Sequence, residues 1–153
     1  MSKHVKVSES VCAGHPDKLA DQISDAILDA ALTQDAYARV AAETLVAKDT
    51  IILAGELSTT ANLDFDSIAR NVIKDNGYTH PGWGFSDRSV IINKLHQQSK
   101  EISIGVDDDG AGDQGLMYGY ATNETDQYLP LPLVLSHTIC RLLDEYRVKK
   151  TIP

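Results

Sequence analysis

The sequence predicts a domain of mixed class, with the order strand–helix–hairpin–helix–strand over residues 4–95. Apolar and polar residues alternate in residues 4–11 and again in residues 39–60, which is typical of strands. Residues 16–33 instead place apolar side chains at i, i+4, i+7 and i+8, the spacing of one helix face. The two periodicities therefore predict a sheet and helices in the same domain.

Composition excludes several classes of protein. The chain has 153 residues and a net charge of −8, which argues against a general nucleic-acid or anionic-membrane surface. No apolar run approaches the length needed to cross a bilayer, and the N-terminus leads into a strand rather than a signal-peptide core. Cys12 and Cys140 lie far apart in the sequence without metal-type spacing, which predicts two reduced thiols in a cytoplasmic protein.

The first helix is predicted to begin at Pro16, inside the stretch Gly14-His15-Pro16-Asp17-Lys18. Proline suits the first helical position and pushes His15 toward an extended conformation. Free N–H groups at the helix start, together with these side chains, form a natural anion site. The alternative is that Asp17 only complements the helix dipole and Lys18 is a solvated charge. Spacing alone leaves both interpretations open.

Residues 39–60 are predicted to form a hairpin with a turn near Lys48-Asp49-Thr50. Glu43 and Glu56 stand inside its otherwise apolar strands. Folding about Asp49-Thr50 would set the two acids opposite each other, and a turn one residue different would leave them close. Paired carboxylates are unfavourable unless one is protonated or a cation lies between them. The pair either marks a site for a cation or an amino group, or points to solvent from an open sheet face.

The second helix is predicted over residues 64–76, with Asp64 as its N-cap and Gly77 just past its end. A strand is expected around residues 90–92, before a polar stretch from residue 96 that reads as a loop able to move. The last helix is predicted over residues 130–148.

Residues 110–115 match the pattern G-x-G-x-x-G, but they do not predict a dinucleotide site. That fingerprint must follow a strand and open a helix. Three aspartates precede it here, and residues 116–121 read as a strand. The glycines indicate tight backbone and close ligand approach instead.

Several motifs together resemble one known family. The run Ser-Glu-Ser-Val-x-x-Gly-His-Pro-Asp-Lys at residues 8–18 resembles the N-terminal signature of S-adenosylmethionine synthetases, also called methionine adenosyltransferases. A small departure is Cys12-Ala13, where the family usually has a glutamate before the glycine. The most specific match is residues 110–125, Gly-Ala-Gly-Asp-Gln-Gly-Leu-Met-Tyr-Gly-Tyr-Ala-Thr-Asn-Glu-Thr. Shorter matches are Ala42-Glu43-Thr44, Gly55-Glu56 and Gln98-Ser99, so the resemblance spans nearly the whole chain.

This resemblance implies an α+β fold in which each domain is a sheet with helices packed on one face. It implies an N-terminal domain over residues 1–100, a mobile active-site loop or linker over residues 101–112, and the beginning of a similar central domain over residues 113–153. Family members are homodimers or dimers of dimers, with active sites between two subunits.

The resemblance also implies the reaction. Members of the family form S-adenosylmethionine from ATP and L-methionine: the sulfur attacks the ribose C5′, and the departing triphosphate is hydrolysed to phosphate and pyrophosphate. Mg²⁺ is required and K⁺ activates. Carried over position by position, the implied roles are His15 as the catalytic, ATP-binding histidine, Asp17 as a Mg²⁺ ligand, Glu43 as the K⁺-site acid, Glu56 and Gln98 for methionine, and Asp113 for both ATP and methionine.

The largest departure from the family is length. The motif Gly-Gly-Gly-Ala-Phe-Ser-Gly-Lys-Asp and the later lysines and arginines that hold the triphosphate are missing. We therefore expect the 153-residue polypeptide to be inactive or very weak alone. The alternative is a non-catalytic binding or regulatory module that associates with a complete synthetase subunit. Retention of the acids and of His15 favours the catalytic interpretation, because association alone does not need them.

Overall fold

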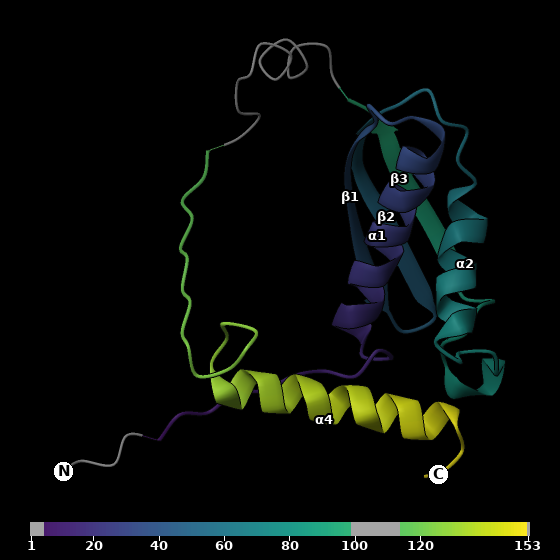
Figure 1. The fold of residues 1–153 in the computed structure, drawn as a ribbon. Coiled ribbons are helices and arrows are strands. Elements are labelled where there is room, and N and C mark those ends of the chain that lie inside the picture. The colour runs from purple at the N-terminus through teal and green to yellow at the C-terminus, as the bar shows by residue number, and fades with distance from the viewer. Residues whose placement is uncertain (1–4, 99–113, 153) are drawn as a thin grey trace. The chain divides into compact units, whose positions relative to one another are not determined.

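The computed structural model describes residues 5–98 and 114–152 (Figure 1). The chain divides into two compact units. One is the sheet unit, residues 16–114, and the other is the terminal unit, residues 1–15 together with residues 115–153.

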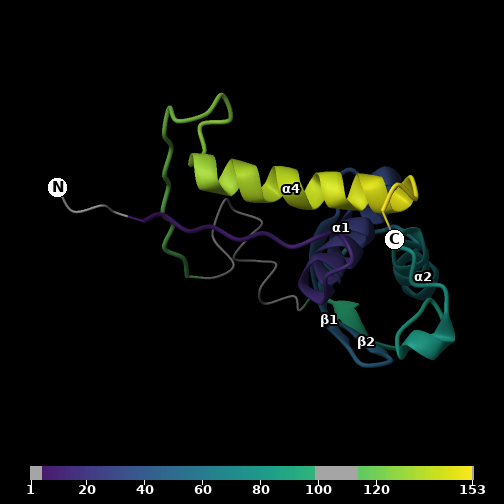
Figure 2. The ribbon, with the colours of Figure 1, turned by 90° about the horizontal axis from the view of Figure 1, so that it is seen from below.

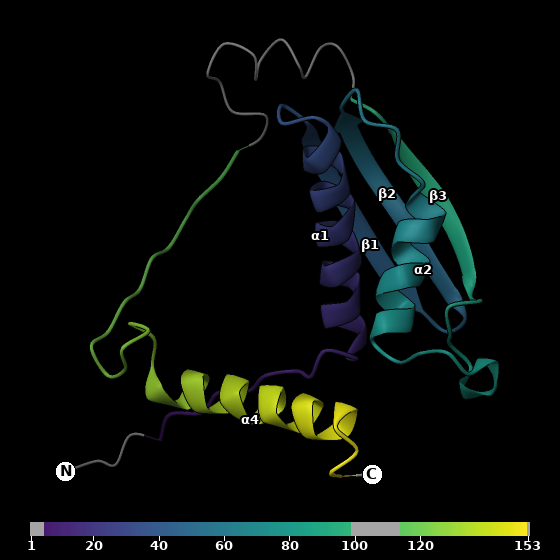
Figure 3. The same cartoon turned by 45° about the vertical axis from the view of Figure 1, so that its right-hand side comes forward.

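The sheet unit is a mixed three-stranded sheet with two helices on one face (Figures 1 and 3). Its strands have the order β1-β2-β3, with β1 antiparallel and β3 parallel to the central strand. The elements are α1 (Pro16–Gln34), β1 (Arg39–Ala47), β2 (Thr50–Ser58), α2 (Phe65–Asp75), the short 3-10 helix η1 (Pro81–Trp83) and β3 (Val90–Gln97). This architecture confirms the α+β class expected from the sequence.

The core lies between the central strand and the two helices. The stripe Leu19, Ile23 and Ile27 of α1 is fully buried, as its helical spacing predicts. It packs in one cluster with alternate residues of β2 and with the inner face of α2, namely Ile51, Leu53, Leu57, Ala69 and Ile73. Because strand side chains alternate between faces, the residues between these on β2 lie on the open face of the sheet.

The hairpin turn is centred one residue earlier in the chain than Asp49-Thr50, the position that would set the two glutamates opposite each other. Ala47 pairs with Thr50, so Glu43 faces Ala54 and Glu56 faces Ala41. The two acids therefore lie on the same face as diagonal neighbours, which is the alternative that a shifted turn allows. Asp49 lies in the left-handed region with φ 52°. Aspartate tolerates this conformation better than most residues.

Strand β3 is longer than the sequence predicts. It continues through His96 and Gln97, which pair with Glu56 and Leu57 of β2. Their polar character indicated a loop, but an edge strand needs only backbone hydrogen bonds from one neighbour. The predicted cap of α2 is confirmed, because an Asp64 carboxylate oxygen accepts a hydrogen bond from the Ser67 N–H at 3.1 Å.

The terminal unit contains α4 (Leu131–Val148), as predicted. The strands predicted at residues 4–11 and 116–121 are wrong for the residues described there, which pair with no strand. Val7 and Tyr118 are 88% and 90% exposed. Alternation produces a strand only where a neighbouring strand supplies hydrogen-bond partners, and the described part of this unit offers none. Residues 6–13 instead run beside α4 (Figures 1 and 2).

Gly55 allows the close approach of β1 and β2. Its φ is +122°, and a Cβ added there would lie 2.0 Å from the Ala41 carbonyl oxygen. We expect Gly55→Ala to lower the free energy of unfolding by about 1–3 kcal/mol, because it combines backbone strain with a clash. Urea unfolding measures the change. Gly119→Ala is the matched control, since a Cβ there meets nothing within 4 Å. Equal stability of the two variants would contradict the strained geometry.

Asp35 joins the end of α1 to the loop after β2. Its carboxylate accepts hydrogen bonds from the N–H groups of Thr60 (2.8 Å) and Tyr37 (3.0 Å) and from the hydroxyls of Thr59 and Thr60. These hydrogen bonds, that of the Thr60 N–H foremost, lower the pKa of Asp35.

This lowered pKa predicts an acid dependence of stability. A carboxyl group whose pKa is lowered by folding stabilises the protein above its unfolded pKa and loses that contribution as pH falls through the folded value. Asp35→Asn should therefore reduce stability at pH 7 and flatten its decline below about pH 4. Urea midpoints across this range test it, with the exposed Asp25→Asn as control. If the stability of Asp35→Asn fell as steeply with acid as that of the parent chain, the role given to Asp35 would be refuted.

Candidate functional site

Three chain segments meet at one edge of the sheet and line a pocket of about 120 Å³. The pocket is lined by Arg39, Val40 and Ala41 at the start of β1, Glu56 near the end of β2, and Gln98 just after β3. β1 runs antiparallel to β2, and β3 runs parallel to it. The start of β1 and the ends of the other two strands therefore meet at the same edge. This brings together Glu56 and Gln98, two residues predicted to contact the same substrate.

Gln98 lines this pocket and contains a buried acceptor without a partner among the described residues. Its backbone N–H donates to the Leu57 carbonyl at 2.9 Å, which extends the β2–β3 hydrogen-bond pattern past the last strand residue. Its side-chain Oε1 is buried and has no hydrogen-bond partner among the described residues. A buried acceptor without a donor costs free energy, so this atom indicates a place where a ligand N–H group would be favourable.

Glu56 lies on the open face of the sheet beside His96. Its Oε1 is 3.3 Å from His96 Nε2, and its side chain is 30% exposed. The contact is an ion pair only when the imidazole is protonated. A carboxylate offers several acceptor positions, so this contact leaves Glu56 able to accept a hydrogen bond from a ligand.

Arg39 and His96 belong to this edge of the sheet but were missed by sequence reasoning. Residue 96 is 40 positions beyond residue 56, and only the parallel register of β3 on β2 makes them neighbours. Arg39 opens β1 and reads as an ordinary strand-end charge in the sequence. No local signal could have identified either residue.

The predicted metal ligands do not form a metal site by themselves. Asp17 lies in the exposed first turn of α1, and Glu43 is exposed on the open sheet face. Within residues 5–98 and 114–152, no group of three or more His, Cys, Asp or Glu side chains could hold a metal ion. Mg²⁺ requires about six oxygen ligands, so each acid could supply one ligand at most. Each acid could therefore supply only part of the coordination of an ion, and no reaction step is assigned to one.

His15 ends a turn directly before α1. Its backbone N–H donates to the Cys12 carbonyl oxygen at 3.0 Å. The helix begins at Pro16, as predicted. His15 belongs to the terminal unit and Asp17 to the sheet unit. Asp113 and the predicted mobile loop at residues 101–112 lie outside the described residues.

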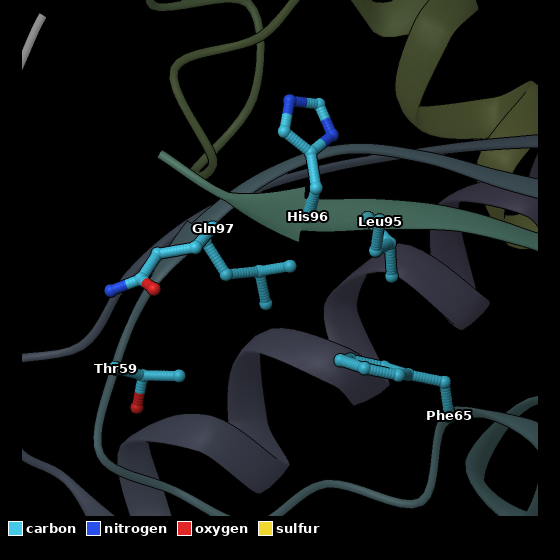
Figure 4. A pocket seen from close by; sticks show the side chains of 6 residues that line it. Thr59, Phe65, Leu95, His96 and Gln97 are labelled. Atoms are coloured by element: carbon cyan, nitrogen blue, oxygen red, sulfur yellow. The ribbon is translucent and has the colours of Figure 1, made fainter. Parts of the chain in front are cut away.

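A larger pocket of about 250 Å³ lies beside β3. It is lined by Leu57, Thr59, Phe65, Leu95, His96 and Gln97. Figure 4 shows Leu95 on the side of the strand that faces Phe65, whereas the His96 ring points to the opposite side. This pocket contains no carboxylate and none of the predicted site residues. The apolar side chains at its centre belong to the core or pack against it.

Comparison with known proteins agrees with the motifs. Residues 3–100 match the family model "S-adenosylmethionine synthetase, N-terminal domain", and residues 108–153 match the model of the central domain. None of the helices in the described part of the chain is both long and apolar enough to span a bilayer.

Similar curated proteins carry the same family name. S-adenosylmethionine synthase 1 of Rhodopseudomonas palustris (strain BisB18) is 49% identical over 157 residues, covering 100% of this chain and 41% of the relative. The S-adenosylmethionine synthase of Sulfurovum sp. (strain NBC37-1) is 48% identical, with 99% and 41% covered. That of Salinibacter ruber (strain DSM 13855 / M31) is 52% identical over 144 residues, with 92% and 37% covered.

The chain thus spans about two fifths of the length of these relatives. Because the N-terminal family model covers residues 3–100 and the central one continues to the last residue, the likeness extends across both units of the structure. This chain belongs to the S-adenosylmethionine synthetase family.

Proposed function

We propose that the chain supplies the methionine pocket and part of the ATP site of a methionine adenosyltransferase. The reaction would join the methionine sulfur to the ribose C5′ of ATP, with release of phosphate and pyrophosphate. The observation that carries this proposal is the pocket at the sheet edge, which Glu56 and Gln98 both line and where Gln98 Oε1 has no partner among the described residues.

The chemistry of this pocket suits an amino acid. An ammonium group has three donors and no acceptor, and it needs partners such as the Glu56 carboxylate and the Gln98 carbonyl oxygen. Arg39 lines the same pocket and brings a positive charge for the α-carboxylate of the substrate. A zwitterion could therefore pair its ammonium with Glu56 and its carboxylate with Arg39. A neutral or purely anionic ligand could not pair with both.

The ATP side of the site rests on the family resemblance and on the start of α1. His15 directly precedes a helix of 19 residues, whose first N–H groups and positive dipole end favour an anion. An imidazole there would stabilise charge that develops on the departing triphosphate. We propose that Asp17 contributes one ligand to Mg²⁺, Glu43 one ligand to K⁺, and Asp113 contacts with both substrates.

Self-association is part of this proposal. The open face of the sheet exposes Leu45 (58%), Val90 (55%) and Ile92 (38%). Clustered apolar side chains on a sheet face are typical of a protein–protein interface. They support a homodimer or a dimer of dimers, and equally the second candidate function, a non-catalytic module that associates with a complete synthetase subunit.

Methionine binding without ATP tests the pocket. We expect Glu56→Gln to weaken methionine binding about 10–100-fold in calorimetry, because a charged hydrogen bond to the ammonium is lost. The exposed Asp25→Asn, with the same charge change, should bind as the parent chain does. An analogue of methionine without its amino group should be insensitive to Glu56→Gln. No methionine binding by the folded parent chain, or equal binding by Glu56→Gln, would refute the pocket.

Turnover tests the catalytic proposal separately. We expect the 153-residue polypeptide, with ATP, methionine, Mg²⁺ and K⁺, to form product at least about 100-fold more slowly than its longer relatives. Its 14 basic residues against 22 acidic ones leave few cations for a triphosphate. Any product should disappear in His15→Ala. Turnover at the rate of the relatives would contradict this expectation, and product that persists in His15→Ala would exclude the role given to that histidine.

A further inference from the structure

The N-terminal segment is held along α4 by contacts at several points. Lys6 Nζ donates to Glu124 Oε1 at 2.7 Å, in the loop before the helix. Ser10 Oγ lies in a hydrogen bond with His137 Nδ1 at 2.8 Å. The Ala13 N–H donates to Asp144 Oδ2 at 2.8 Å. All of these residues belong to the terminal unit.

The order of these contacts shows that the segment and the helix run in the same direction, and their spacing shows that both advance by similar distances between contacts. From Ser10 to Ala13 an extended chain advances about 10 Å. From His137 to Asp144 a helix advances about 10.5 Å. The two advances agree, so hydrogen bonds on both sides fix the positions of the two residues between them, Val11 and Cys12, relative to α4.

Cys12 is one of these two residues, and it faces Cys140. Its thiol donates to the Cys140 carbonyl oxygen at 3.8 Å, and the neighbouring Cys140 thiol helps to raise the pKa of Cys12. Both cysteines are free and partly buried. They are the only two cysteines of the chain, although 128 positions separate them.

We propose that Cys12 and Cys140 form a reversible disulfide within the chain, through exchange with a small-molecule disulfide such as oxidised glutathione. One protein thiolate attacks a sulfur of the small disulfide and releases one small thiol. The second protein thiolate then attacks the mixed disulfide and releases the other. The protein gives up two protons and two electrons, and the small disulfide becomes two thiols.

The disulfide would tie the turn before α1 to α4. Cys12 begins that turn, since its carbonyl oxygen accepts the His15 N–H at 3.0 Å. Oxidation would therefore restrict the motion of His15 relative to α4. Its effect on catalysis rests on the proposed function, but formation of the bond does not.

Exchange should accelerate with pH. Burial, foremost, raises the pKa of the Cys12 thiol, and the neighbouring Cys140 thiol and Asp144 act in the same direction, whereas Arg147 opposes them. The thiolate that attacks a disulfide is accordingly scarce at neutral pH.

The experiment equilibrates the full chain with buffers of reduced and oxidised glutathione, both native and in urea, followed by acid quenching. Intact mass and peptide mapping under non-reducing conditions then count each species. We expect a monomer that has lost two hydrogens and contains a peptide linking Cys12 to Cys140. Because a disulfide that fits the fold stabilises it, the equilibrium constant for closure should be about 30–1,000-fold larger in the native chain than in urea.

Variants test whether the folded structure favours the Cys12–Cys140 disulfide or whether it forms independently of the fold. Ser10→Ala removes the hydrogen bond to His137 and should lower closure only in the native chain. Ser8→Ala is the matched control, because its side chain makes no such hydrogen bond within residues 5–98 and 114–152. Equal closure constants in native and urea-unfolded chains would overturn the proposal. So would native products limited to disulfide-linked dimers or to glutathione adducts on single cysteines.

These measurements use no methionine or ATP. If the disulfide does not form, the proposed methionine pocket is unaffected. If methionine does not bind, the proposed disulfide is unaffected.

Discussion

Burial of the central strand is the constraint on which the sheet unit depends. β2 is hydrogen-bonded on both edges and carries alternate apolar side chains under α1 and α2. Ile51 and Leu53 are completely buried, and Leu57 nearly so. Because strand side chains alternate, this burial forces the intervening residues to the open face. Glu56 is one of them, so the same interaction that builds the core also places the acid of the candidate pocket.

The pocket depends on strand register more than on any single side chain. Antiparallel pairing brings Arg39 to the end of β2, and parallel pairing brings Gln98 to the same edge. Gly55 permits this arrangement because a side chain there would collide with the Ala41 carbonyl oxygen. The glycine and the acid adjoin each other in the family motif Gly55-Glu56. The glycine allows the strands to approach, and the acid lines the candidate pocket.

The terminal unit follows a different principle. Its N-terminal segment has no strand partner among the described residues and is positioned instead by side-chain hydrogen bonds to a helix. Such contacts are individually weak, and together they set a register. They position the turn from Cys12 to His15, and they bring Cys12 next to Cys140, which is distant in the sequence. Cys12 belongs to the two-residue departure Cys12-Ala13 from the family signature, and it lies against Cys140.

Local patterns in the sequence were sufficient for the helices, the Asp64 cap and the existence of the hairpin, although not for its register, because these features depend on residues near in the chain. The stripe from Leu19 to Ile27, the Asp64 cap and the start of α1 at Pro16 all agree with prediction. The motifs identified the family and named Glu56 and Gln98 as partners in one site. What the sequence could not supply was long-range pairing.

Only the tertiary structure decided the register of β3 on β2, which adds His96 to Glu56 and extends the strand into a polar stretch. It also decided that the alternating residues 5–11 and 116–121 form no strands, because alternation predicts a strand but not a neighbour for it. The meeting of Cys12 with Cys140 belongs to the same class of fact. Contacts across many residues depend on how whole elements pack, and one sequence contains no local signal for them.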